Sequence, residues 1–348
     1  MKRATILATA LLVTLTACGD NEANTQNEAV DNATNEQGNE INEPANNEPS
    51  DNNETSVSEE EVNEEDATGE FPVTVTDASG EEVTIEEEPE SIVSLLPSNT
   101  EIGFALGLGD KFVGVTEYCN YPVEASEVES IGAMDVDVER ILELAPDLAL
   151  VAEYHASSNP EMLDQFESVG IDVLVVDGAN SFDETYEMIS IIGEATGTDD
   201  VAEEIISDIQ AQVSDIEELS ANVEETKTVW VEVGPSPEIY TTGTNTFMHE
   251  MLEIIGAENA AGEFEGWVNL SEEEIIALQP DTIVTTYGDY IEDPLQEVTG
   301  RNGWQEVPAV MNEDIHDVDS DMVTRFGPRL ADGLQLVAEA VYPDVYNQ

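Results

Sequence analysis

The sequence contains very few basic residues. Eight Lys and Arg stand against 79 Asp and Glu in 348 residues, which gives a formal net charge of -71. Nucleic acids and anionic membrane surfaces are bound through a positive footprint, so this chain is a poor partner for either. The acids are spread along the whole chain. We interpret them as an adaptation of solubility to high salt, where charge screening acts over short distances.

Because bases are so rare, each one that remains is expected to have a specific partner. Lys2 and Arg3 belong to an N-terminal targeting segment, and the other six are Lys111, Arg140, Lys227, Arg301, Arg325 and Arg329. The last two stand together at the start of the final predicted helix. For Arg325 two interpretations stay open, a functional residue or one half of a structural ion pair.

The sequence has only two cysteines, and we expect them to have separate roles. A positive start is followed by an apolar stretch at residues 6–16, which is too short to span a bilayer. It runs into Leu15-Thr16-Ala17-Cys18, which resembles a bacterial lipobox, the signal in which the Cys is acylated and becomes the mature N-terminus. This predicts a signal peptide over residues 1–17 and a lipid on Cys18; an ordinary signal peptide with a chance Cys is the alternative. Cys119 then has no partner, so no disulfide is expected.

Residues 18–70 lack the apolar side chains that a folded core requires. From residue 19 to residue 70 there are 17 acids, 12 Asn, no base and four large apolar residues. Such a segment cannot bury enough surface to fold, and its like charges extend it. We predict a disordered acidic tether that holds a lipid-anchored domain away from the membrane. No later stretch approaches the ~20 apolar residues of a membrane span.

The sequence also lacks the common motifs of catalysis. It has no His-Glu-x-x-His, no Gly-x-Ser-x-Gly and no Gly-rich phosphate loop. A zinc or manganese site of the binding-protein type would need His and carboxylate ligands in both halves, and His155, His249 and His316 are scattered. We therefore expect no enzyme, no catalytic residue and no resident metal or cofactor. A cell-surface hydrolase or metal-dependent enzyme is the alternative from another class.

One sequence motif, which we call the doubled phrase, occurs twice in the chain. Residues 139–151, ERILELAPDLALV, return at residues 273–285 as EEIIALQPDTIVT, with Glu, Ile, Leu, Pro and Asp in register. Each copy predicts a short amphipathic helix stopped by Pro and followed by an apolar strand. A helix ending in Gly precedes each copy, at Gly107 and at Gly256. The duplication predicts two similar α/β lobes with a binding site in the cleft between them.

Strand and helix signals alternate in both halves, as they do in a parallel sheet covered by helices. The first lobe is expected over residues 71–198. It opens with a hairpin, continues with a buried strand at residues 92–96, and then has Ser98-Asn99-Thr100-Glu101 as the capping box of a helix. Residues 199–225 contain no Gly or Pro and keep an apolar helical stripe, which predicts one long helix between the lobes. The second lobe is expected over residues 226–348.

Three segments carry a resemblance to a known family. IVSLLPSNTE at residues 92–101, GVTEYCNYP at residues 114–122 and the doubled phrase resemble the iron-siderophore/vitamin B12 class of substrate-binding proteins, which serve ATP-driven importers. The resemblance covers about residues 91–342, implies a binding domain over about residues 91–348, and is strongest to the cobalamin-binding members. It implies a class III periplasmic-binding-protein-like fold, two Rossmann-like lobes bridged by a single long α-helix. It also implies a monomer at the outer face of the cytoplasmic membrane that serves an ABC permease dimer with its ATPase subunits.

The resemblance implies a ligand and its contacts. Tyr118 matches a Tyr whose ring lies against the corrin, and Trp267 matches a corrin-packing Trp of the second lobe. Asp321 and Arg325 match an Asp-x-x-x-Arg pair that faces the polar edge of the ligand. The implied ligand is cobalamin or a related corrinoid, a broad ring held by aromatic faces and a few polar anchors.

Some positions leave the ligand open. The Trp residues of the family's first lobe are missing, with Met134 and residues 153–155 nearby instead. A ferric siderophore or haem is therefore the alternative, and His155 could then touch bound iron. Ser98 and Asn99 are expected either as a helix cap or as ligand contacts at a helix N-terminus.

The doubled phrase suggests how the permease is recognised. Glu139 and Glu273 occupy the same place in the two copies, and the family uses such a pair to dock onto arginines of the permease. The alternative is that acids in the first turn of a helix simply complement its dipole.

Overall fold

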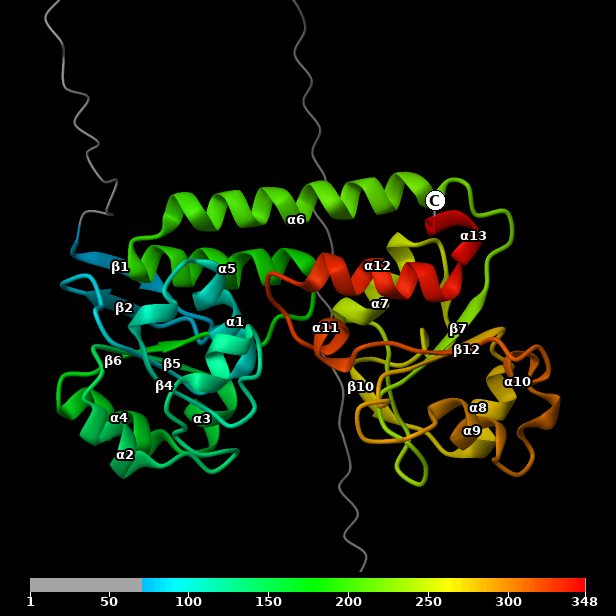
Figure 1. Ribbon diagram of the computed structural model, residues 1–348, viewed down its shortest axis with the longest axis horizontal. Helices are drawn as coiled ribbons and strands as arrows, with labels where there is room; N and C mark the ends of the chain where they lie inside the picture. The colour runs from blue at the N-terminus through cyan, green and yellow to red at the C-terminus, as the bar shows by residue number, and fades with distance from the viewer. Residues whose placement is uncertain (1–70, 348) are drawn as a thin grey trace, which may run out of the picture. The chain divides into compact units, whose positions relative to one another are not determined.

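The structure is a computed structural model, and it describes residues 71–347 (Figure 1). The predicted signal peptide, Cys18 and the tether lie outside the described residues. Over residues 71–347 the fold is α/β, with two lobes that are each built around a four-stranded parallel sheet. This confirms the predicted fold class. Among the described helices, none is both long and apolar enough to cross a membrane.

The first lobe begins with the predicted hairpin and continues as a strand–helix alternation. Its elements are β1 (Val73–Thr76), β2 (Glu82–Ile85), β3 (Ile92–Ser94), α1 (Pro97–Ala105), η1 (Gly109–Lys111), β4 (Phe112–Val115), η2 (Val123–Glu127), α2 (Val138–Leu144), β5 (Leu148–Val151), α3 (Glu153–Ser158), α4 (Pro160–Ser168), β6 (Asp172–Val175) and α5 (Phe182–Thr196).

The second lobe repeats the alternation, with an antiparallel ribbon of β8 and β10 added. Its elements are β7 (Thr228–Glu232), β8 (Tyr240–Thr242), α7 (Phe247–Ile254), β9 (Glu258–Asn259), β10 (Trp267–Asn269), α8 (Glu272–Leu278), β11 (Thr282–Thr285), α9 (Pro294–Thr299), η3 (Trp304–Glu306), α10 (Pro308–Met311), β12 (Ile315–Asp317), α11 (Ser320–Thr324), α12 (Leu330–Val341) and α13 (Pro343–Tyr346).

The two sheets have the same topology. The strand order is β4-β3-β5-β6 in the first lobe and β12-β11-β7-β9 in the second. Numbered along the chain within each lobe, both sheets read 2-1-3-4. Open parallel sheets bind ligands outside the carboxyl ends of their strands, where the strand order reverses. In this protein those places are the ends of β3 and β5 in one lobe and of β7 and β11 in the other.

The doubled phrase forms the same structure twice, as predicted. α2 and α8 are both seven residues long, and each is followed by a residue in the left-handed conformation, Ala145 (φ 46°) and Gln279 (φ 51°), just before the Pro. The Asp after the Pro then binds the neighbouring strand. Asp147 Oδ2 accepts from the backbone N–H of Ser91, and Asp281 Oδ2 accepts from that of Thr228. These hydrogen bonds tie the start of the third strand to the start of the first in each lobe.

The capping box predicted at Ser98 is wrong. α1 begins at Pro97, its N-cap is Leu96, and no side chain caps it. Proline is favoured at the first helical position because its fixed φ suits a helix and its missing N–H is not needed there. The helix therefore starts one residue before Ser98, and Glu101 binds arginines of the second lobe instead.

The long helix between the lobes is present but shorter than predicted. α6 spans Asp199–Ser220 and packs against α5 of the first lobe and against α7, α12 and α13 of the second (Figure 1). Its buried face includes Ile209 and Ile216. The helix ends at Ser220 because the chain then turns toward β7, and Val223 packs onto the core of the second lobe.

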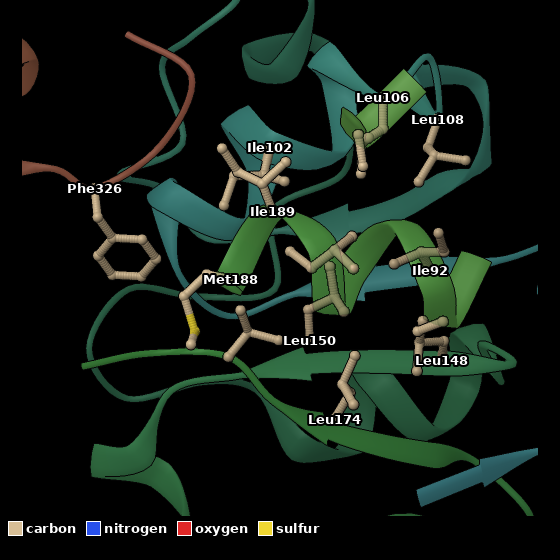
Figure 2. Packing of buried hydrophobic residues seen from close by; sticks show 14 of the residues in the cluster. Ile92, Ile102, Leu106, Leu108, Leu148, Leu150, Leu174, Met188, Ile189 and Phe326 are labelled. Atoms are coloured by element: carbon tan, nitrogen blue, oxygen red, sulfur yellow. The ribbon is translucent and has the colours of Figure 1, made fainter. Parts of the chain in front are cut away.

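The cores show that the lobes also touch beside α6. In Figure 2, Phe326 of the second lobe lies beside Met188 of α5 and Ile102 of α1, within the main core cluster of the first lobe. In the opposite direction, Phe182 of α5 packs in the core of the second lobe. Its backbone N–H donates to Glu250 Oε2 of α7 at 2.9 Å. The lobes are therefore joined by packed side chains as well as by a helix.

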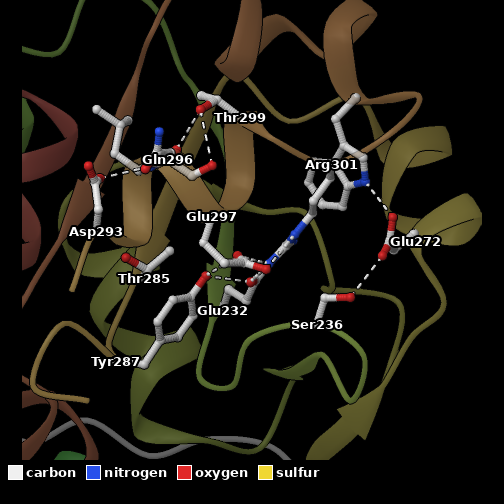
Figure 3. Close-up of polar contacts among 12 residues, drawn as sticks. Glu232, Ser236, Glu272, Thr285, Tyr287, Asp293, Gln296, Glu297, Thr299 and Arg301 are labelled. Carbon is white, nitrogen blue, oxygen red and sulfur yellow. Dashed lines mark hydrogen bonds and ion pairs between the residues drawn. The ribbon is translucent and has the colours of Figure 1, made fainter. Parts of the chain in front are cut away.

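The second lobe contains a buried ion-pair network. Figure 3 shows Glu232 and Glu297 around Arg301, with the Tyr287 hydroxyl donating to Glu232 Oε1 at 2.7 Å. The Glu232 side chain is fully buried and that of Arg301 is 4% exposed. Burial and the charge of Glu232 raise the pKa of Tyr287 well above its usual value. The Arg301 guanidinium also lies 4.7 Å from the ring centre of Trp304.

We predict that Arg301→Met lowers the free energy of unfolding by about 3–5 kcal/mol, because it leaves the buried Glu232 carboxylate without its counter-ion. Urea denaturation at neutral pH measures the change. The matched control is Arg140→Met, which removes a partly exposed arginine with two carboxylate partners and is expected to cost much less. Equal losses in the two variants would contradict the prediction.

Candidate functional site

A hollow lies between the two lobes, at the carboxyl side of their sheets. It is lined by residues 96–98 and 177–180 of the first lobe, and by Phe247, Trp267 and residues 324–326 of the second. Its volume is about 370 Å³. Pockets for small molecules range over roughly 300–1,000 Å³, so this hollow is large enough to hold part of a ligand. We call it the interlobe hollow.

The walls of the interlobe hollow are largely apolar. Phe247 and Phe326 come from the second lobe and Leu96 from the first. Phe247 begins α7, and Phe326 follows α11. Neither residue was predicted as a site residue from the sequence. Both are mostly buried against the protein, and nothing in their local sequence distinguishes them from core residues.

An exposed aromatic face stands beside the hollow on the β8–β10 ribbon. Trp267 pairs with Thr242 and Asn269 pairs with Tyr240, so these side chains share one face of the ribbon. Trp267 is 49% exposed and Tyr240 is 45% exposed. Trp267 and Tyr240 occupy diagonal positions, which in a two-stranded ribbon lie about 7–8 Å apart, close enough for the two aromatic side chains to act together. Tyr240 was missed in the sequence because the register of the ribbon is a tertiary feature.

Arg325 is held by groups from both lobes. Its Nη1 donates to Glu101 Oε1 at 2.9 Å and to Asn120 Oδ1 at 2.7 Å. Its Nη2 lies 2.7 Å from Asp321 Oδ1, and the Asn120 side-chain amide donates to the other Asp321 oxygen at 2.8 Å. Asp321 and Arg325 are therefore paired with each other, as their spacing allows, and both are tied to the first lobe.

Glu101 is the centre of this interlobe contact. It is 3% exposed and accepts from Arg325 and from both Nε and Nη2 of Arg329, the last two at 2.8 Å. The Arg329 guanidinium lies 4.0 Å from the ring centre of Tyr121 in the first lobe. Burial lowers the pKa of Arg329, but the bonds and charge of Glu101 more than offset this and raise it. We call Glu101, Arg325, Arg329, Asn120 and Asp321 the interlobe clasp.

The other predicted binding residues differ in how deeply they are buried and in whether they line the interlobe hollow. Ser98 lines the interlobe hollow from the second position of α1. Asn99 is fully buried behind it, where its amide donates to the carbonyl of Val176 and its Oδ1 has no partner among the described residues. Tyr118 is 51% exposed and is not among the residues that line the hollow, but its backbone carbonyl accepts a long contact from Arg325, which does line it.

A second, smaller hollow lies on the first lobe. Met134, Tyr154 and His155 are among its lining residues, and its volume is about 240 Å³. Burial lowers the pKa of His155, so this imidazole stays neutral below the usual pH of histidine protonation. The Ala152 backbone N–H donates to its Nδ1 at 3.3 Å, which leaves the proton on Nε2. Among residues 71–347 no group of His, Cys, Asp or Glu is arranged to hold a metal ion.

Glu139 and Glu273 lie away from the interlobe hollow, at matching places in the two lobes. Each is the second residue of its helix, α2 or α8, and each is exposed. In Figure 1 these two helices lie on the side of the described domain opposite to α6. The residue before Glu273, Glu272, is fixed by hydrogen bonds from Ser236 and from the Trp304 indole (Figure 3).

Three comparisons place the chain among known proteins. A sequence profile described as periplasmic binding protein matches residues 92–322. The uncharacterized ABC transporter substrate-binding lipoprotein YvrC of Bacillus subtilis (strain 168) is 46% identical over 77% of this chain and 85% of that protein. A vitamin B12-binding protein of Vibrio cholerae is 27% identical over 71% of this chain and 87% of that protein. A solved structure of a possible iron-binding (periplasmic solute-binding) protein of Staphylococcus epidermidis has a TM-score of 0.67 and 33% identity, over 74% of this chain and all of that one.

Proposed function

The chain belongs to the periplasmic binding protein family, and we propose that it captures a corrinoid between its lobes and delivers it to an ABC importer. Membership of this family confirms the prediction of a substrate-binding protein that is not an enzyme. The vitamin B12-binding relative covers both lobes, which supports the choice of ligand class.

The observation that carries the ligand proposal is the exposed aromatic face of the β8–β10 ribbon. Trp267 lines the apolar hollow, and Tyr240 shares its face of the ribbon; both residues are about half exposed. Exposed aromatics on one face are suited to a broad, rigid ring system, because each ring buries a large area at little cost in conformational entropy. Tyr118 of the other lobe is also exposed, and in this proposal its ring covers the opposite side of the ligand.

A ferric siderophore is the second candidate. The Staphylococcus epidermidis structure, which resembles this chain closely in fold, is described as possibly iron-binding. A chelate of this kind is more compact than a corrinoid and depends less on flat aromatic contacts. Loss of the aromatic side chains is therefore expected to weaken the binding of a corrinoid more than that of a siderophore.

We predict that Trp267→Ala weakens the binding of cyanocobalamin about tenfold or more, since an aromatic face buried on a ligand contributes on the order of 1–3 kcal/mol. Tyr240→Ala is expected to weaken it in the same direction, and Trp267→Phe to restore most of the loss. Equilibrium dialysis of the full-length protein in detergent measures the affinities. Met311→Ala, an exposed apolar residue of α10, is the control. If the ligand binds Trp267→Ala and the unaltered protein equally well, the aromatic face is not the corrinoid site.

Glu139 and Glu273 are proposed as the contacts with the permease. They are exposed and occupy equivalent positions, and their helices α2 and α8 lie on the side away from α6, so one two-fold partner can meet both. The helix-dipole interpretation also accounts for an acid in each first turn, and the first turn of α8 holds three, so the proposal rests on the equivalence of the two positions and their shared side of the domain. Contacts of this kind act on recognition of the partner and leave the ligand site alone.

The Glu139→Ala/Glu273→Ala double variant is expected to keep its ligand affinity while uptake in liposomes reconstituted with the permease falls at least several-fold. The loss arises because two permease cations are left without partners at the interface. The control is Glu203→Ala/Glu218→Ala, two exposed acids of α6 on the other side of the domain. Unchanged uptake by the first variant would return both glutamates to the role of dipole-complementing acids.

Cys18 is proposed to carry the lipid that anchors the protein at the outer face of the cytoplasmic membrane. The proposal rests on the lipobox-like sequence before it and on the Bacillus subtilis relative, which is described as a lipoprotein. The intact mass of the membrane-bound protein should show loss of residues 1–17 and a diacyl or triacyl addition. The Cys18→Ala variant should lose the addition, and an unmodified mature chain that still begins at Met1 would exclude the anchor.

A further inference from the structure

Every basic residue between positions 71 and 347 is paired with an acid. The pairs are Lys111 with Glu88, Arg140 with Glu129 and Glu143, Lys227 with Asp314, Arg301 with Glu232 and Glu297, Arg325 with Glu101 and Asp321, and Arg329 with Glu101. The described part of the chain therefore holds no lysine or arginine that is available to neutralise an anionic ligand without giving up a carboxylate.

Arg325 is the cation of the interlobe hollow, and its terminal nitrogens are already engaged. Nη1 has oxygen partners on Glu101 and Asn120, and Nη2 has Asp321 and the Tyr118 carbonyl. A carboxylate is best recognised by two parallel N–H groups of an arginine. Arg325 could offer such a pair to a ligand only by breaking the interlobe clasp.

The remaining charge at the hollow is negative. Asp177 lines the hollow and accepts from the backbone N–H groups of Glu153 and Gly178, at 3.2 and 2.7 Å. A ligand carboxylate placed here would lose water, would face Asp177 and would find no cation without a partner of its own. Neutral amides and cationic groups meet none of these penalties.

We propose that the interlobe hollow selects ligands that carry no net negative charge, with Arg325 acting as a bridge between the lobes and not as a counter-ion for the ligand. The proposal rests on the proposed capture of a ligand between the lobes and narrows its chemistry. Corrinoids with neutral amide side chains and neutral or cationic ferric hydroxamates fit the hollow. Haem, with two carboxylates, and ferric catecholates, with several negative charges, do not.

The test compares four probes on the full-length protein in one buffer. Cyanocobalamin is neutral and ferrioxamine B is cationic, whereas haemin and ferric enterobactin are anionic. We expect at least one of the first two to bind at least tenfold more tightly than either anionic probe, which corresponds to about 1.4 kcal/mol. Added salt should weaken this preference, since it screens the charges that generate it.

A charge variant tests the cause. Asp321→Asn removes one acid partner of Arg325 and should raise the affinity for haemin, relative to that for the tighter neutral or cationic probe, by about tenfold. The control is Glu88→Gln, which makes the same charge change at the exposed ion pair with Lys111, outside the residues that line the hollow. The control should leave the ratio of affinities unchanged.

The outcomes separate this proposal from the choice of a corrinoid. Tight ferrioxamine B binding without cyanocobalamin binding would reject the corrinoid and keep the charge selection. Cyanocobalamin and haemin bound equally well would keep the corrinoid and overturn the charge selection. Binding of an anionic probe alone, or of no probe, would overturn both.

Discussion

The arrangement of the two lobes depends on one buried carboxylate. Glu101 of α1 receives hydrogen bonds from two arginines that follow α11 in the other lobe. A buried charge that loses its partners costs several kcal/mol, so separating these groups is unfavourable. Together with α6 and the packing of Phe326 on the first core, this contact fixes where the two sheets face each other. The interlobe hollow is the space that this arrangement leaves open.

The same contact explains why Arg325 had two interpretations in the sequence. In a chain with 79 acids, a guanidinium finds carboxylates readily, and an arginine at a cleft can serve the protein or the ligand. The geometry gives Arg325 oxygen partners from four residues, two of them in the loop after β4. Lysines and arginines are rare in this chain, and the arginine at the cleft is already paired. The polar character of the cleft is therefore set by acids, amides and aromatic rings.

Much of the fold could be predicted because its signals lie between neighbouring residues and because the same motif occurs in both lobes. The left-handed residue before Pro146 and Pro280, the strand that follows and the Gly at the preceding helix end all depend on neighbours in the sequence. The predicted start of α1 was wrong because Pro97 is favoured as the first residue of a helix, so the helix begins before Ser98 and Ser98 cannot be its N-cap. The predicted end of α6 was wrong because the helix stops where the chain turns toward β7, and that turn is set by the tertiary structure.

The candidate site was less accessible to sequence reasoning. Family resemblance pointed to Trp267 and Arg325, but the ribbon register that sets Tyr240 on the face of Trp267 joins strands far apart in the chain. Phe247 and the partners of Glu101 belong to the same class of long-range contacts. Such pairs carry no periodic signal, because each depends on how two lobes meet.

We propose that the ligand carried between the lobes is a corrinoid. An ultraviolet–visible spectrum of the protein purified from its own host, without added ligand, would reveal it. We expect the absorption bands of a bound corrinoid, lost on unfolding and recovered in the small-molecule fraction. A Soret band of haem, or the charge-transfer band of a ferric siderophore, would contradict it.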